Sequence, residues 1–204
     1  MKKLLLVLFF FALAATPSQA QIEDVLSRTS LEAGWGYSQP TSLTGHASGS
    51  DYAGLDSYYA GAHYSFAELW GGRLTYAYNR FKHKDAETYS LSLHKIMLES
   101  TFNVSRAITQ QGQEPFEVLL HTGLGISIGK SFDNTASTDA MGSFQIGLMP
   151  KYYITDGISM HVDASYIVNF SQDYGFDGGF AKADGSRGSG SYFLINLGLA
   201  FKMN

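Results

Sequence analysis

The sequence predicts an all-β protein, namely an eight-stranded antiparallel, up-and-down transmembrane β-barrel. Apolar and polar residues alternate with a period of two along most of the chain, which is the pattern of strands with two different faces. Several of these runs exceed the ~5–6 residues usual in globular strands and match the roughly 9–11 residues of a tilted strand that crosses a bilayer. Only 16% of the 204 residues are charged, well below the soluble average of about 25%.

The N-terminus has the features of an export signal. Lys2 and Lys3 precede an apolar run over 4–15, and small residues follow up to Ala20, as in a secretory signal peptide with its cleavage site. The apolar run is shorter than the roughly 20 residues of a spanning helix. We therefore expect a cleaved signal peptide at 1–20, rather than an anchor that stays attached, and a barrel domain at 21–204.

The first half of the barrel domain contains four alternating runs. The fourth is irregular, because its apolar residues up to Leu93 have one parity and those from Ile96 onwards have the other. A β-bulge near His94 and Lys95, or a loop that ends at Leu93, would reconcile the two parities. The four predicted strands are 30–38, 57–66, 73–82 and one within 88–104.

The second half contains four cleaner runs. In the third of them the residues Ile158, Met160 and Val162 alternate with Ser159, His161 and Asp163. Two different faces of this kind fit a strand with lipid on one side and a polar interior on the other. The predicted strands are 116–129, 142–154, 158–170 and 191–202.

The composition of the two faces decides between a membrane barrel and a soluble one. A soluble exported barrel or sandwich would turn its apolar face inward and cover its outside with Lys and Glu. Here the less apolar face is rich in Gly and Ser, and few charges interrupt the apolar face. A charged side chain facing the middle of the bilayer costs roughly 2–4 kcal/mol. These features favour the membrane barrel, with the apolar face outside.

The lengths of the breaks between strands predict the orientation. Breaks at 39–56, 130–141 and 171–190 are long and polar, whereas those at 67–72 and 155–157 are short. An even number of strands places both termini on one side, so we expect periplasmic turns at the short breaks and external loops at the long ones. One pair of breaks departs from this rule. The break at 105–115 is expected to be a periplasmic turn, yet it is longer than the break at 83–87, which is expected to be an external loop.

Two segments resemble an OmpA-type outer-membrane barrel: 150–160, around Thr155-Asp156-Gly157, and the closing strand 192–201. The resemblance extends over 21–204 and lies in the architecture rather than in one diagnostic motif. We expect no peptidoglycan-binding domain after the barrel, and in domain content the chain resembles the small OmpX-like members. Residues 202–204 also follow Phe201, whereas many such barrels end on the aromatic residue.

The resemblance implies an integral protein of the cell outer membrane with a role in envelope integrity or surface interaction. The expected partners are outer-membrane lipid and, through the external loops, host or cell-surface molecules. A closed barrel of this size is expected to be a monomer. Three aromatic residues of the last loop would either anchor a binding surface or extend the strands above the membrane: Tyr174, Phe176 and Phe180.

The polar face carries the candidate site. The interior of an eight-stranded barrel is just wide enough for side chains to fill it, and buried charges need partners. We therefore expect a structural polar network in the lumen, in which Arg73 pairs with Glu32 or Glu117. The alternative is an ion or proton path, as in a narrow porin-like channel for small solutes. The predicted network residues are Glu32, Arg73, Glu117, His121, Lys151, His161 and Asp163, with His63 and Lys202 on the same face.

Other function classes find little support in the sequence. The histidines of the polar face lie on separate strands without ligand spacing, so we predict no metal and no cofactor. A lipid A-modifying enzyme is the weakest alternative, because its only nearby Ser-His pair, His46 and Ser48, lies in a loop. We therefore predict no catalytic residues and no enzyme. A net charge of −4 argues against nucleic acid as a partner.

Overall fold

The computed structural model describes residues 19–45, 47–109, 115–131 and 138–203. Most of the predicted signal peptide lies outside these residues, so its cleavage stays a prediction. Within the described residues, no helix has the length and apolar character needed to cross a membrane.

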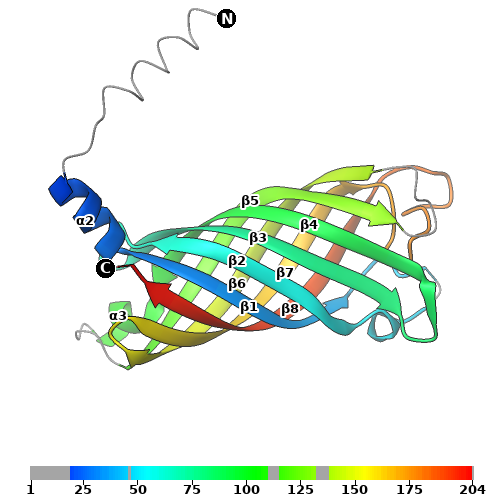
Figure 1. Ribbon diagram of the computed structural model, residues 1–204. Helices are drawn as coiled ribbons and strands as arrows, with labels where there is room; N and C mark the ends of the chain where they lie inside the picture. The colour runs from blue at the N-terminus through cyan, green and yellow to red at the C-terminus, as the bar shows by residue number, and fades with distance from the viewer. Residues whose placement is uncertain (1–18, 46, 110–114, 132–137, 204) are drawn as a thin grey trace, which may run out of the picture.

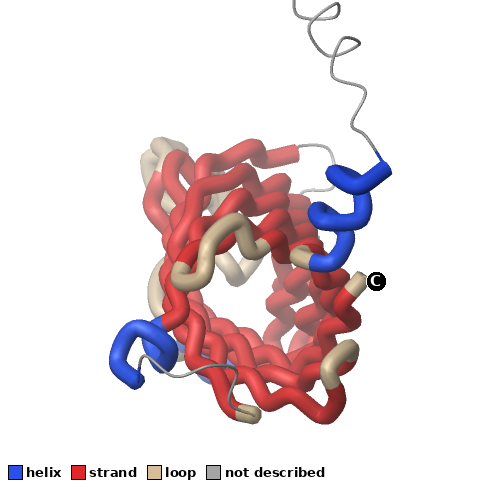
Figure 2. The backbone as a smooth tube through the Cα atoms, turned by 90° about the vertical axis from the view of Figure 1, so that its left-hand side faces the viewer, coloured by secondary structure: helices blue, strands red, loops and turns tan. Residues whose placement is uncertain are grey.

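Eight antiparallel strands of the described chain form a closed barrel in sequence order, and the first strand pairs with the last (Figures 1 and 2). This confirms the predicted fold class. Closure leaves no free sheet edge, which matters in hydrocarbon because each unpaired backbone group there costs several kcal/mol. The strands are β1 (Thr29–Pro40), β2 (Gly54–Tyr64), β3 (Trp70–His83), β4 (Ala86–Asn103), β5 (Phe116–Ser131), β6 (Thr138–Thr155), β7 (Ile158–Gln172) and β8 (Gly188–Lys202).

The two ends of the barrel differ in their connections (Figure 1). The end that we call the terminal end holds the helices α2 (Gln19–Ser27) and α3 (Val104–Thr109), the β2–β3 and β6–β7 turns, and the C-terminus. The opposite end, the loop end, holds the β1–β2 connection with a short 3-10 helix at Gly49–Asp51, the tight β3–β4 turn and the long β7–β8 connection. Both ends of the described chain therefore lie at one end of the barrel, as the strand count predicts, but the tight β3–β4 turn lies at the loop end and the longer β4–β5 connection at the terminal end.

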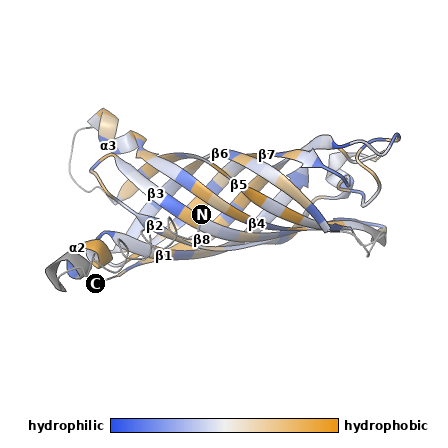
Figure 3. Ribbon diagram, turned by 90° about the horizontal axis from the view of Figure 1, so that it is seen from above, coloured by the Kyte–Doolittle hydropathy of each residue, from blue (hydrophilic) through white to orange (hydrophobic). Residues whose placement is uncertain are grey.

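The outer wall is an apolar belt. On β7 every outward residue from Ile158 to Phe170 is apolar or aromatic, while the residues between them face the lumen. Figure 3 shows the resulting alternation of hydrophobic and hydrophilic positions along the strands. Exposed apolar side chains ring the barrel on all strands, which is the arrangement of a lipid-facing surface. They include Leu31, Tyr58, Leu74, Leu98, Leu124, Leu148, Val162 and Leu197.

Strand β4 corrects the sequence interpretation. Its pairing with β3 and β5 runs without a break past His94 and Lys95, so both the predicted bulge and the predicted loop ending at Leu93 are wrong. Leu91 and Leu93 face the lumen and are fully buried. The apparent change of parity arises because the lumen itself becomes apolar towards the loop end.

An apolar plug fills the loop end of the lumen. Strand residues Phe81, Leu91, Leu93, Met141, Ile167, Tyr192 and Leu194 pack there with Tyr52, Tyr174 and Phe176 from the loops. The connection between β7 and β8 folds inward: the Phe176 N–H donates to the Leu43 carbonyl at 2.7 Å, and Ser131 Oγ donates to the Gly178 carbonyl at 2.6 Å.

The plug changes the expectation for the three loop aromatics. Tyr174 and Phe176 are buried in the plug, so they neither anchor an outer binding surface nor extend a strand. Only Phe180, at 63% exposure, stays on the surface. The inward turn buries apolar rings that would otherwise meet water.

Candidate functional site

The centre of the lumen is a charged cluster around Arg73 of β3. Its guanidinium donates a hydrogen bond to Glu32 of β1 and another, at 2.8 Å, to Asp163 Oδ2 of β7. Glu99 Oε2 of β4 lies 3.6 Å from the same guanidinium. Arg73 is 1% exposed, so a single cation is enclosed by three carboxylates. This pairing offsets the cost of removing the charges from water.

His121 of β5 joins two of these carboxylates. Its Nδ1 lies 2.5 Å from Glu99 Oε2, and its Nε2 lies 3.3 Å from Asp163 Oδ1. Thr75 donates a further hydrogen bond to Glu99 at 3.1 Å, and Ser165 donates one to Asp163. The carboxylates are therefore held from several strands at once, which fixes the cluster in one arrangement.

Lys95 extends the cluster towards the loop end. Its ammonium donates to Gln145 Oε1 at 2.7 Å, and Gln145 Nε2 contacts Glu99 Oε2 at 3.4 Å. Lys95 also lies 5.6 Å from the centre of the Tyr192 ring, which belongs to the apolar plug. Lys95 therefore links the charged cluster to the apolar plug.

Tyr59 and His161 form a hydrogen-bonded pair beside the cluster. The Tyr59 ring also lies under the Arg73 guanidinium, with 5.3 Å between the guanidinium carbon and the ring centre. Gly34 and Gly198, which pair across β1 and β8, leave the space for these rings. A Cβ at Gly34 would lie 2.4 Å from Tyr59, so only glycine fits there.

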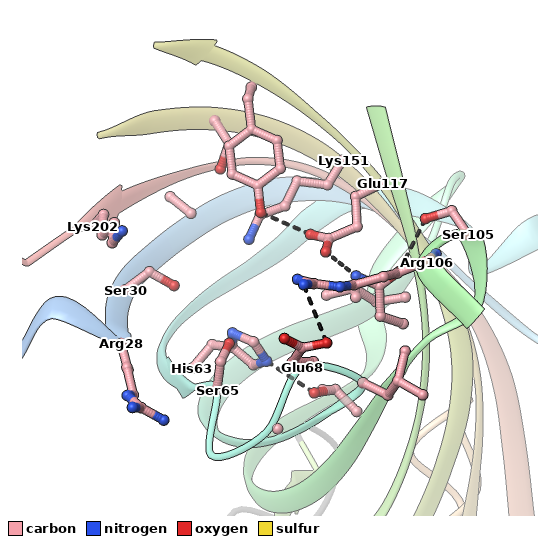
Figure 4. Close-up of a pocket in the computed structure, with 18 of the residues that line it drawn as sticks. Arg28, Ser30, His63, Ser65, Glu68, Ser105, Arg106, Glu117, Lys151 and Lys202 are labelled. Atoms are coloured by element: carbon pink, nitrogen blue, oxygen red, sulfur yellow. Dashed lines mark hydrogen bonds and ion pairs between the residues drawn. The ribbon is translucent and has the colours of Figure 1, made fainter. Parts of the chain in front are cut away.

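The terminal end of the lumen contains a cavity of about 550 Å³ (Figure 4). Glu117 lies on its wall and accepts hydrogen bonds from Asn103 and from Tyr153, the latter at 2.7 Å. Lys151 and Lys202 line the same cavity. His63 of β2 also lines the cavity, and its Nε2 lies 2.9 Å from Thr101 Oγ1.

The structure separates the seven predicted network residues into groups. Glu32, Arg73, His121 and Asp163 form the central cluster, and His161 joins it through Tyr59. Glu117 and Lys151 instead lie at the cavity, so Arg73 pairs with Glu32 and not with Glu117. Lys202, which we expected on the same face, lies exposed at the rim.

Sequence reasoning missed Lys95, Glu99 and Gln145. The alternation along β4 could have identified Lys95 and Glu99. They are adjacent to Ile96 and Leu98, which face outward, so they must face the lumen. The uncertain parity of this strand hid them.

The residues considered for catalysis show no catalytic arrangement. His46 lies outside the described residues, and Ser48 is a loop residue whose Oγ accepts a hydrogen bond from Ser50 at 3.0 Å. The stretch Gly125–Gly129 has the G-x-S-x-G spacing of a nucleophile elbow, but Ser127 is buried within β5 and bonds to Ser143 at 2.7 Å. No group of three His, Asp or Glu residues in the described chain is arranged to hold a metal ion.

Solved structures share this architecture. The crystal structure of Neisserial surface protein A is similar over 87% of this chain and 98% of that chain, with a TM-score of 0.60 and 16% sequence identity. This chain has the fold of the eight-stranded outer-membrane barrels. The similarity at this identity concerns the fold alone.

Other outer-membrane-type barrels match less closely in shape. The Ail protein of Yersinia pestis covers 85% of this chain and 97% of its own, with a TM-score of 0.44 and 15% identity. A major outer membrane protein of Thermus thermophilus has a TM-score of 0.47 and 11% identity, over 85% of this chain and 97% of that chain. No protein-family model and no curated protein sequence matches the chain.

Proposed function

We propose that this chain is a closed, non-conducting barrel of the outer membrane with a role in envelope integrity or in surface interaction through its external loops. In this proposal the protein is exported with cleavage of residues 1–20, the terminal end faces the periplasm and the loop end faces outward. The apolar belt contacts lipid. A single chain completes the barrel, so the proposed state is a monomer.

The observation that supports a closed barrel is the filling of the lumen at two successive levels. The central cluster and the plug are both almost inaccessible to water: Arg73 is 1% exposed, and Phe176 is fully buried. A conducting pore would leave its lining side chains in contact with water. The proposal includes no catalytic step, since the charged groups of the cluster bond to one another.

Solute flux tests the closed state. The native chain, refolded into liposomes and shown to be folded by its altered migration on an unboiled gel, should give the same swelling rate in small sugars as protein-free liposomes. Swelling that depends on the amount of folded protein would replace this proposal by the second one.

That second proposal is a narrow porin-like channel for small solutes. It is favoured by the cavity at the terminal end, which opens the lumen as far as His63. Passage beyond His63 would require the cluster around Arg73 and the plug to rearrange.

A deletion strain separates the two proposed roles of a closed barrel. A loop variant in which the exposed Lys182 and Arg187 are replaced by Ser changes the surface of the β7–β8 connection and none of the plug residues. If the role is envelope integrity, native and loop-variant genes should restore detergent resistance equally. If the role is surface interaction, only the native gene should restore adherence. Failure of the native gene in both assays would contradict the proposal.

A further inference from the structure

Helix α3 carries an apolar face that the rest of the described chain leaves largely uncovered. Val104 and Ile108 are one helical turn apart and share this face. Ile108 is 77% exposed, the highest value among the large hydrophobic side chains of the described residues. Figures 2 and 3 show α3 outside the ring of strands, at the terminal end of the barrel. The side chain of Ile108 therefore meets either water or something outside the chain.

The opposite face of α3 fastens the helix to the barrel. Asn103 Oδ1 caps the helix by accepting hydrogen bonds from the Arg106 N–H at 2.9 Å and from Ser105 Oγ at 3.0 Å. Ser105 Oγ itself accepts a hydrogen bond from the Val118 N–H of β5 at 3.0 Å. Arg106 pairs with Glu68 of the β2–β3 turn at 3.4 Å. These contacts are all polar, and they hold the apolar face of the helix in one orientation.

Helix α3 lies at the margin of the apolar belt. Phe102 is the last outward-facing residue of β4 before the helix, and its ring packs against Trp70 of β3 with 4.7 Å between the ring centres. On the other side of the helix, Phe116 begins β5 and pairs in register with the exposed Tyr152 of β6. Aromatic residues gather where a barrel passes from hydrocarbon to headgroups. The helix is therefore at the level of a membrane surface.

We propose that α3 rests on the membrane surface at the terminal end, with Val104 and Ile108 in contact with lipid acyl chains. An amphipathic helix at such a surface buries its apolar face at the boundary between headgroups and acyl chains, and its polar face stays in water. This contact continues the lipid surface of the belt and removes the exposed Ile108 from water. The inference rests on the part of the proposed function that places the belt in lipid. It depends neither on a closed lumen nor on which end of the barrel faces the periplasm.

Quenching of a fluorescent label by nitroxide-bearing lipids tests the contact. The chain contains no cysteine, so Ile108→Cys, Leu124→Cys and Asp156→Cys each provide one labelling site. Leu124 lies in the belt, and Asp156 lies exposed in the β6–β7 turn of the same end as α3. The labelled proteins are folded, checked by gel shift and placed in phosphatidylcholine nanodiscs. Nitroxides near the start of the acyl chain should quench the labels at 108 and 124 at least about twice as strongly as the label at 156.

Two unlabelled variants give a second readout. Trypsin can cleave after Arg106, and nanodiscs leave both membrane surfaces open to the protease. Ile108→Ser should raise the rate of this cleavage at least about twofold, because local opening of α3 no longer costs a lipid contact. Ile108→Val keeps an apolar side chain and should be cleaved at the native rate.

The possible failures are distinguishable. A label at position 108 that is quenched no more than the label at 156, while the label at 124 is quenched, would overturn the inference and leave the belt intact. Equal cleavage of the native, Val and Ser proteins would overturn it as well. An unquenched label at 124 would contradict the lipid-facing belt, and with it the proposed function. Disulfide-linked dimers of the Ile108→Cys protein in nanodiscs would show that a second copy, rather than lipid, covers the helix.

Discussion

The two halves of the lumen are filled by different physical means. Towards the terminal end, charged groups from five strands neutralise one another around Arg73. Towards the loop end, aromatic and aliphatic side chains pack around Phe176. The charged half depends on pairing, because each unpartnered ion would retain its full desolvation cost. The apolar half depends on volume and close packing.

This difference determines how each half should fail. Removing one ion from the charged half leaves its partners buried without compensation, so a single substitution affects the whole barrel. Removing one ring from the apolar half leaves a cavity and frees a loop, while the strands stay paired.

Arg73→Met should lower the free energy of unfolding by about 3–5 kcal/mol, because three buried carboxylates lose their common cation. Urea unfolding in detergent micelles, followed by the shift on unboiled gels, measures the loss. Arg187→Met is the control: Arg187 pairs with Asp173 on the surface, and such a pair contributes at most about 1 kcal/mol. An Arg73 variant as stable as the native chain would show that the cluster does not hold the barrel together.

Phe176→Ala should cost about 3 kcal/mol of packing free energy and should release the β7–β8 connection. Trypsin should then cleave after Lys182 faster than in the native chain, while the gel shift of the folded barrel persists. Phe180→Ala removes an exposed ring that stacks on Tyr174 in the same connection, and it should raise the cleavage rate less than Phe176→Ala does. Equal rates for all three proteins would mean that Phe176 does not fasten the loop.

Gly178→Ala should loosen the same connection more weakly, by about 1–2 kcal/mol. Gly178 has φ +83°, and a Cβ there would lie 3.0 Å from the Ser90 carbonyl oxygen. Gly54→Ala is the control, because a Cβ at Gly54 meets nothing within 4 Å. The prediction is checked by the same tryptic assay, and it is wrong if the two alanine variants behave alike.

The smallest effect concerns a surface pair outside the membrane. The hydrogen bond from Lys84, at 2.8 Å, holds the pKa of Asp51 below its usual value. A carboxyl group with a lowered pKa stabilises the folded loop above its unfolded pKa, and this contribution is lost as the pH falls through the folded pKa. Lys84→Met should raise the pKa of Asp51 towards its ordinary value in an NMR titration. An unchanged pKa would leave the backbone N–H of Ser48, at 3.1 Å, as the dominant cause.

The polar half of the lumen could be predicted from the sequence to a greater extent than the apolar half. Strict alternation, as on β7, fixes which residues face inward, and it places His161 and Asp163 on the lumen side. The partners of Arg73 depend on the stagger between strands around the barrel. Alternation alone does not contain this stagger, so it left open the choice between Glu32 and Glu117.

The apolar half escaped prediction because both faces of the strands are apolar there. Leu91 and Leu93 face the lumen but resemble lipid-facing residues, and this reversed the apparent parity of β4. The inward fold of Tyr174 and Phe176 depends on contacts with distant residues, such as the hydrogen bond to the Leu43 carbonyl. No local pattern in the 171–190 stretch encodes those contacts.

Single-channel recording in a planar bilayer tests most directly the central claim that two independent layers close the lumen. Four proteins are compared: the native chain, a plug variant with Tyr174→Ala and Phe176→Ala, a cluster variant with Glu32→Ser, Arg73→Ser and Asp163→Ser, and the combination of both. Gel-shift controls show that each is folded. The account predicts silence for the first three and discrete conductance steps for the combination. Steps from the folded native chain would contradict it.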